Sequence, residues 1–314
     1  MSEFGAKSTT DDVLEGLDLS GRTYFITGGN SGLGQETARA LASKGAHVIL
    51  AGRDEAALEA SRAEILGSVG DAQVDTIICD LASIESVRQC GTQARERFER
   101  IDVLINNAGV MACPFGHTLD GFERQFGTNH IGHFVLTNEL LPLVEKGRDA
   151  RIVNLSSLAH HRSGVDFDDP NFETREYDKQ VAYGQSKTAN ALHAVALKTR
   201  LSAKGIEAFS VHPGGIMTNL GRHLTAADLA AMMKRLNEMG DGGFEFKTIP
   251  QGAATSAWAA TAPDLAGQGG AYLENCQIAE VSEETQASGV RPYAINPQLA
   301  EHLWDESERM VAAA

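Results

Sequence analysis

Short apolar runs rich in β-branched residues alternate along this chain with longer segments of helical periodicity. The apolar runs fall at residues 23–28, 46–51, 74–79, 102–107, 150–156, 206–212 and 270–274. Most are continuous, as expected for strands that helices cover on both faces. Residues 34–45, 83–98 and 186–205 carry helical patterns between them. The rhythm predicts an α/β fold, a single doubly wound parallel sheet of about seven strands with helices on both faces.

Length and charge favour one domain and exclude some partners. The 314 residues contain no evident repeat or linker, so we expect a single domain with an N-terminal extension over about residues 1–20. The formal charge of −15 disfavours nucleic acid, and no apolar stretch reaches the roughly 20 residues of a membrane span. The N-terminus lacks signal-peptide features, and the four cysteines have no C-x-x-C spacing. We therefore expect a cytoplasmic protein with reduced thiols.

A glycine-rich turn, TGGNSGLG (27–34), follows the first expected strand and opens a helix. Glycine permits a tight turn and a close approach to a pyrophosphate, whose charge a helix N-terminus stabilises. The spacing G-x-x-x-G-x-G departs from the usual fingerprint G-x-G-x-x-G, and a purely structural turn is the alternative. The strand-to-helix context favours a dinucleotide site. Its expected contacts here are Gly28, Asn30, Ser31, Gly32, Leu33 and Gly34.

The next two strand ends carry residues suited to the adenosine half of such a ligand. Arg53 follows the second strand, where arginine suits a 2′-phosphate and an acidic residue would suit the ribose hydroxyls. NADP(H) is therefore favoured over NAD(H), unless Arg53 is only a solvated surface residue. Asp80, with Leu81 beside it, follows the third strand and is expected to bind the adenine amino group. The alternative for Asp80 is a helix cap, for which Ser83 competes.

The fourth, fifth and sixth strands end in NNAG (106–109), NLSS (154–157) and HPGG (212–215). Asn107, Ala108 and Gly109 would let the chain pass close to a flat ring, although a simple turn is the alternative. Turns prefer such residue types in any protein, so part of this pattern has no functional meaning. Because ligands bind beyond the carboxyl ends of parallel strands, the combination still favours a binding site at that edge.

The segment AYGQSK (182–187) places Tyr183 and Lys187 four residues apart. On a helix the two side chains lie one turn apart on the same face. A free tyrosine has a pKa of about 10, and a nearby ammonium group favours the phenolate. We expect Lys187 to lower the pKa of Tyr183 and make it an acid/base group. A pair on a solvated surface is the alternative.

Together TGGNSGLG, NNAG, LSS, YGQSK and HPGG resemble the short-chain dehydrogenase/reductase family, over roughly residues 20–280. GTNHIGHF, RIVNLSSLAHH and AYGQSKTAN resemble its branch of retinol dehydrogenases and the WW-domain oxidoreductase. The resemblance implies a Rossmann-type sheet and hydride transfer between nicotinamide C4 and an alcohol or carbonyl carbon. An NADP(H)-dependent reduction of a ketone or aldehyde on a largely apolar small molecule is expected.

The resemblance also implies roles for individual residues. Tyr183 would be the proton donor or acceptor, and Lys187 would lower its pKa and bind the nicotinamide ribose. Ser157, rather than Ser156, would bind the substrate oxygen, and Asn129 would hold a water that links Lys187 to solvent. The loop after the sixth strand would line the nicotinamide through Pro213, Gly214, Ile216 and Thr218, with Thr218 bonding its carboxamide.

Two other functions are weighed against this one. A non-catalytic NADP(H)-binding redox sensor has no need of the intact Ser157, Tyr183 and Lys187. A sugar-nucleotide epimerase or dehydratase would need a substrate domain, for which the short region after the sixth strand leaves little room. Relatives often associate through the helices around Asn129 and Tyr183, so a homodimer or homotetramer is left open beside a monomer.

The remaining features concern the histidines and two C-terminal segments. His130 and His133 lie three residues apart, but without an H-E-x-x-H pattern we expect packing or a substrate contact and no metal site. Residues 216–250 are expected to form a substrate lid, and NPQLAEHLWDESERMV (296–311) an amphipathic packing helix. The lid is predicted from an apolar helical stripe of Leu229, Met232, Met233 and Leu236.

Overall fold

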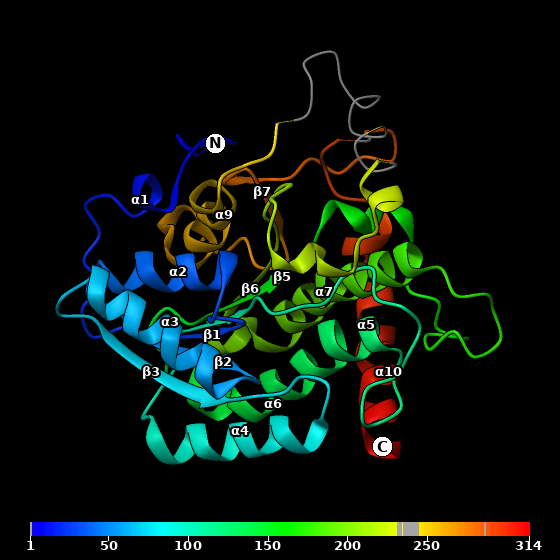
Figure 1. The fold of residues 1–314 in the computed structure, drawn as a ribbon, viewed down its shortest axis with the longest axis horizontal. Helices are drawn as coiled ribbons and strands as arrows, with labels where there is room; N and C mark the ends of the chain where they lie inside the picture. Colours follow the sequence, from blue (N-terminus) through cyan, green and yellow to red (C-terminus); the bar gives the residue numbers. More distant parts are fainter. Residues whose placement is uncertain (1, 231–233, 235–244, 286) are drawn as a thin grey trace.

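The computed structural model of the protein describes residues 2–230, 234, 245–285 and 287–314 (Figure 1). The strands are β1 (Thr23–Thr27), β2 (His47–Gly52), β3 (Gln73–Ile78), β4 (Val103–Asn106), β5 (Arg151–Leu155), β6 (Glu207–His212), β7 (Tyr272–Glu274) and β8 (Gln277–Ile278). The α-helices are α1 (Thr10–Val13), α2 (Gly32–Ala42), α3 (Glu55–Ser68), α4 (Ile84–Arg97), α5 (Arg124–Phe126), α6 (Gly132–Val144), α7 (Lys179–Leu201), α9 (Ile249–Thr261) and α10 (Pro297–Ala313). The seven expected strands are all present.

The strands form one sheet in the order β3-β2-β1-β4-β5-β6-β7-β8. All neighbouring pairs are parallel except β7 and β8, which are antiparallel. The strand order reverses between β1 and β4, and ligands of doubly wound sheets bind at the carboxyl ends beside this switch point. The predicted doubly wound sheet is confirmed, and only the two-residue strand β8 was not expected from the sequence.

Helices cover both faces of the sheet, which explains the continuous apolar runs. In β1, Tyr24 and Ile26 pack in the core on one face and Phe25 packs in the core on the other. The first core includes residues of α1, α2, α3 and α9, and the second includes residues of α4, α6, α7 and α10. Figure 1 shows α1, α2 and α9 on one side of the sheet, with α4 and α6 on the opposite side.

Both terminal segments pack against the domain. Val13 and Leu14 of the N-terminal extension are buried in the core that contains α9. Leu303 of α10 is buried, and the Trp304 ring lies 4.9 Å from the Phe134 ring of α6. The amphipathic C-terminal helix is thus confirmed as a packing element. Because α10 packs along α7, a second subunit could contact the covered face of α7 only if α10 moved.

Among the residues that the structure describes, no helix is long and apolar enough to span a membrane.

Candidate active site

The turn after β1 is a glycine cradle that a side chain would fill. A Cβ atom on Gly34 would lie 2.3 Å from the carbonyl oxygen of Gly28 and 2.5 Å from Nδ2 of Asn107. Gly28 and Gly32 have positive φ angles of 65° and 55°, a conformation that favours glycine. The turn therefore requires its glycines for its shape.

Helix α2 begins in this turn with its first N–H groups uncapped. Ser31 occupies the N-cap position, but its side chain accepts no hydrogen bond from the first turn of the helix. By contrast, α3 and α4 have side-chain caps, provided by Asp54 and Ser83 respectively. An uncapped helix N-terminus beside a glycine turn suits a pyrophosphate group. The residues present therefore fit the expected dinucleotide.

The ends of β2 and β3 carry the two residues expected at the adenosine half. Arg53 is exposed, and within the described residues its guanidinium has no hydrogen bond or ion pair. Asp80 accepts a hydrogen bond from Ala82 N through Oδ1 at 3.0 Å, whereas Ser83 caps α4 by accepting from Ser86 N at 3.2 Å. The helix-cap alternative for Asp80 is therefore wrong, because Ser83 is the N-cap residue of α4.

The turn after β4 is fastened to the end of β1. Asn107 Nδ2 donates to the carbonyl oxygen of Thr27 at 2.7 Å. Thr27 Oγ1 accepts from Asn107 N and from Ala108 N, each at 2.9 Å. A Cβ on Gly109 would lie 3.1 Å from Asn129 Oδ1 and 3.7 Å from Lys187 Nζ, so this turn passes directly beside the lysine.

Tyr183, Lys187 and Ser157 come together at the carboxyl end of β5. Lys187 Nζ lies 5.6 Å from the centre of the Tyr183 ring and donates to the carbonyl oxygen of Leu155 at 2.9 Å. Tyr183 and Lys187 are both 4% exposed. Ser157 is half-buried at the start of the 3-10 helix Leu158–Arg162. The surface-pair alternative is therefore wrong.

The expected lowering of the Tyr183 pKa is also wrong for the protein alone. Burial raises the pKa of Tyr183 to about 12, and a hydrogen bond from Ser157 opposes this only in part. Burial lowers the pKa of Lys187 to about 8. Removal from water disfavours the charged form of each group, and this outweighs their proximity. Tyr183 is therefore a neutral phenol that holds its proton.

The two adjacent serines have different surroundings. Ser156 is buried, and its hydroxyl donates to the main-chain oxygen of Lys187 at 2.8 Å. Ser157 accepts from Ala159 N at 3.1 Å and hydrogen-bonds Tyr183. Ser156 thus joins β5 to α7, whereas Ser157 faces the phenol.

Asn129 lies in the π-helical turn Gly127–Ile131 and is fully buried. Its side chain accepts from Val110 N at 2.8 Å and donates to Val110 O and Ser186 Oγ, each at 2.9 Å. Ser186 precedes Lys187, so Asn129 joins the turn after β4 to α7. The expected role of Asn129 in holding a water stays a prediction.

The loop after β6 turns back towards the glycine cradle. Gly214 has a φ of 103°, and a Cβ on Gly32 would lie 3.5 Å from Cγ2 of Thr218. Thr218 Oγ1 accepts from Leu220 N, and the Ile216 side chain faces Gly252 of α9. Pro213 is half-buried beside this turn. The loop residues therefore lie near the site. Thr218 accepts this capping bond and keeps its own hydroxyl hydrogen, so its expected bond to the carboxamide stays a prediction.

Lys247 was not expected from the sequence and lies at the base of the same loop. Its amide donates to Gly215 O at 2.9 Å, which brings the two ends of residues 215–247 together. Its ammonium group donates to Asn275 Oδ1 at 2.7 Å. The lid prediction rests on Met232, Met233 and Leu236, which lie outside the described residues.

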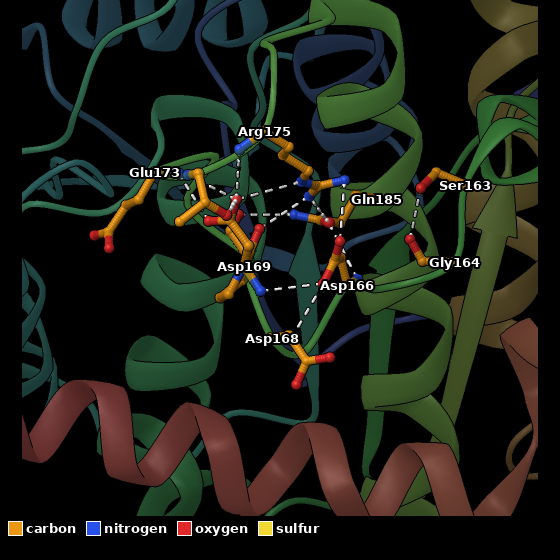
Figure 2. Close-up of polar contacts among 10 residues, drawn as sticks. Ser163, Gly164, Asp166, Asp168, Asp169, Glu173, Arg175 and Gln185 are labelled. Carbon is orange, nitrogen blue, oxygen red and sulfur yellow. Dashed lines mark hydrogen bonds and ion pairs between the residues drawn. The ribbon is translucent and has the colours of Figure 1, made fainter.

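The long segment between Ser157 and Tyr183 is fastened to the helix that carries the tyrosine (Figure 2). Gln185 Oε1 accepts from Arg175 Nη2 at 2.8 Å, and Gln185 Nε2 donates to Pro170 O at 2.9 Å. The Asp169 carboxylate accepts three backbone N–H groups and one hydroxyl, which lower its pKa to about 2. Gln185 therefore connects this segment to α7 between Tyr183 and Lys187.

The buried histidines make hydrogen bonds within the fold. His130 Nε2 lies 2.8 Å from Ser307 Oγ of α10, and His160 Nδ1 lies 2.7 Å from Ser157 O. Within the described ranges, no group of three or more His, Cys, Asp or Glu side chains could hold a metal ion. Packing, which was one of the two roles expected for His130, is its role here.

Comparisons with known proteins agree with this geometry. The sequence pattern of the family described as short chain dehydrogenase matches residues 22–229. The chain is 44% identical to short-chain dehydrogenase TIC 32 B, chloroplastic, of Brassica napus, over 99% of this chain and 95% of that protein. It is 40% identical to human retinol dehydrogenase 13, over 93% of this chain and 85% of that protein.

Two solved structures have the same fold. An uncharacterised protein from Mycobacterium paratuberculosis superposes with a TM-score of 0.71 at 34% identity, over 96% of this chain and 97% of that chain. RhlG of Pseudomonas aeruginosa, in an active-site complex with NADP, superposes with a TM-score of 0.65 at 25% identity, over 86% and 98% of the two chains. The chain belongs to the short-chain dehydrogenase family and is an oxidoreductase that acts on alcohols and their carbonyl counterparts with a nicotinamide cofactor.

Proposed function

We propose that this protein is an NADP(H)-dependent reductase of ketones or aldehydes on largely apolar small molecules. The observation that carries the proposal is the cluster of the buried Tyr183 and Lys187 with the half-buried Ser157, beside the turn at Gly109. This cluster places a protonated phenol next to a hydroxyl and a cation at the switch point of the sheet. The cofactor, when bound, supplies or accepts the hydride.

The protonation state of Tyr183 supports reduction as the direction. With a pKa of about 12, the phenol keeps its proton at neutral pH. A developing alkoxide is a much stronger base than a phenolate, so transfer of this proton to it is favourable. Ser157 donates to the same oxygen, and a donor at this position is worth about 3–4 kcal/mol in comparable sites. Tyr183 is the proposed acid and Ser157 the proposed oxyanion donor.

Lys187 and Asn129 have supporting roles in this proposal. Lys187 uses one of its three N–H donors on Leu155 O, which leaves two for the ribose of the cofactor. Asn129 holds the turn after β4 against Ser186 and so fixes the distance between that turn and Lys187.

NADP(H) is preferred over NAD(H) in this proposal because of Arg53. Its guanidinium is exposed at the carboxyl end of β2 and has no partner among the described residues. A free guanidinium binds a phosphate through two parallel hydrogen bonds. The solved structure of RhlG is a complex with NADP, which is compatible with this preference.

The apolar class of substrate has two supports. Relatives include retinol dehydrogenases 13 and 14, at 40% identity to the human and mouse proteins respectively. In addition, Phe115 and Met217 are 47% and 61% exposed on the loops that follow β4 and β6. Exposed apolar side chains at the rim of a site suit an apolar ligand.

The test is a panel of apolar ketones and aldehydes, followed by the loss of NADPH absorbance. Tyr183→Phe is expected to lower kcat at least about a hundredfold, the usual scale of acid catalysis, while NADPH binding stays near that of the wild type. Tyr24→Phe is the matched control, because Tyr24 is buried in β1 and its hydroxyl has no partner. Wild-type activity in Tyr183→Phe would refute the assignment.

Arg53→Asp tests the choice of cofactor in the same assay. The variant is expected to lose the preference for NADPH, with the ratio of kcat/KM for NADPH over NADH falling at least about tenfold. An unchanged ratio would contradict the 2′-phosphate assignment and would leave the proposed reaction standing.

A further inference from the structure

One histidine joins the turn after β4 to the helix that carries Asn129. His133 follows Asn129 by four residues on α6 and is 1% exposed. Its Nδ1 lies 2.9 Å from the main-chain oxygen of Asn129, and its Nε2 lies 2.9 Å from Oγ1 of Thr27 at the end of β1. The two nitrogens of one ring therefore contact two different parts of the site.

The direction of both hydrogen bonds follows from the chemistry of the partners. A carbonyl oxygen can only accept, so Nδ1 of His133 carries the hydrogen that bonds Asn129. Burial lowers the pKa of His133 to about 4, so the ring is neutral at pH 7. Nε2 then has a lone pair and accepts from the Thr27 hydroxyl.

This orientation of the Thr27 hydroxyl determines what holds the turn after β4. Because the hydrogen of Thr27 points to His133, the lone pairs of Oγ1 are left for Asn107 N and Ala108 N, each at 2.9 Å. The alternative acceptor for that hydrogen is Ile105 O, at 3.5 Å the longer contact.

Asn129 holds the other end of the same turn through two hydrogen bonds. Its side-chain oxygen accepts from Val110 N, and its side-chain nitrogen donates to Val110 O. Residues 107–110 are thus fastened at the start through Thr27 and at the end through Asn129. His133 is bonded to both of these residues. Gly109, between the two attachments, faces Lys187.

We propose that His133 is a positioning residue that sets turn 107–110 against Asn129 and Lys187. The inference rests on the proposed function, in which that turn is a wall of the nicotinamide site. His133 itself does not touch Tyr183 or Ser157 in any hydrogen bond of the described structure.

Two variants separate the two halves of the ring. Asparagine places its amide nitrogen near the position of Nδ1, so His133→Asn keeps a donor for Asn129 and loses the acceptor for Thr27. Glutamine reaches the position of Nε2, so His133→Gln keeps an acceptor for Thr27 and loses the donor for Asn129. His130→Asn is the matched control. His130 is equally buried, and within the described residues its side chain hydrogen-bonds only Ser307 of α10.

Amide hydrogen exchange at residues 107 and 108 and the Kd for NADPH are the first readouts, since neither needs turnover. In His133→Asn, exchange at these amides is expected to rise at least about tenfold and NADPH to bind at least about fivefold more weakly. His133→Gln is expected to keep both near the wild type. His130→Asn is expected to lower Tm without a change in either readout.

Turnover measurements then separate this inference from the proposed function. His133→Asn should raise KM for NADPH more than it lowers kcat, and Thr27→Val should reproduce that pattern without an additive effect in the double variant. If His133→Asn behaves as His130→Asn does, or the effects of Thr27→Val and His133→Asn add fully, the proposal is overturned. If His133→Asn does not fold, His133→Leu, which fills the same space without a donor or an acceptor, decides by the same exchange and Kd measurements. A wild type that binds NADPH but reduces no carbonyl would refute the function and leave this test intact.

Discussion

Acidification to about pH 5 is expected to unfold this protein through its buried histidines. His133, His160 and His193 are at most 2% exposed, and burial lowers their pKa values to about 4, 3 and 3 from an ordinary 6.5. The unfolded chain therefore binds protons that the folded chain excludes as the pH falls below about 6.5. The free energy of unfolding must fall with pH in this window.

The size of the effect follows from these pKa values. At about pH 5 each of the three histidines costs about 2 kcal/mol, and together they cost about 6 kcal/mol. The free energy of unfolding of most domains is only about 5–15 kcal/mol in total. Asp169, whose pKa is lowered to about 2, loses its stabilising effect only below its ordinary value of 3.8 and so acts in a separate, more acidic window. The raised pKa of Glu123 opposes the trend weakly, because its protonation favours the folded state.

The assay is urea unfolding at a series of pH values, followed by the fluorescence of Trp258 and Trp304. Near pH 5 unfolding should take up at least about three protons, one for each of these histidines, and the slope of the unfolding free energy against pH measures this uptake. His130 and His212, whose pKa values burial also lowers, add to it. His193→Phe should reduce that uptake by about one proton, since His193 packs between aromatic rings that phenylalanine can join. Phe134→Leu, a change in the same aromatic cluster that removes no titratable group, should leave it unchanged.

An unfolding free energy that stays constant from about pH 7.5 to pH 5 would refute the reasoning. So would an undiminished proton uptake in His193→Phe.

Four further substitutions test the site. Gly34→Ala should weaken NADPH binding at least about tenfold in a fluorescence titration, because the added carbon overlaps the backbone of the turn. Ser157→Ala should lower kcat about 10²–10³-fold with little effect on Tm, whereas Ser156→Ala should lower stability by about 1–3 kcal/mol in thermal melts and leave kcat within about threefold. Arg175→Ala should speed proteolysis of residues 163–178 while KM for NADPH stays the same, since its partner Gln185 points to that segment.

The strands of the sheet could be predicted because each is buried on both faces. Ile49 and Leu50, adjacent in β2, lie in different cores, so neither position accepts a polar residue and the run is continuous. Strand β8 has only two residues and pairs along one antiparallel edge, which leaves no recognisable pattern.

The site was predicted in its residues but not in its electrostatics. The four-residue spacing correctly places Tyr183 and Lys187 on one face of α7. It does not reveal that both groups are shielded from water, and this shielding raises the pKa of Tyr183 to about 12 and lowers that of Lys187 to about 8. The spacing of two residues along a helix shows on which face their side chains lie. Their removal from water depends on every element that packs around them, and this is what shifts their pKa values.

The amino-acid sequence by itself determined the α/β class, the glycine turn and the order in which polar residues follow the strands. These depend on local periodicity and on backbone conformations that only certain residues adopt. The tertiary structure alone decided that His133 bonds Thr27 and Asn129, that Gln185 holds residues 163–178, and that Lys247 closes the base of the loop after β6. Each of these contacts joins residues that are distant in the chain or depends on the direction of a side chain, and a local pattern contains neither kind of information.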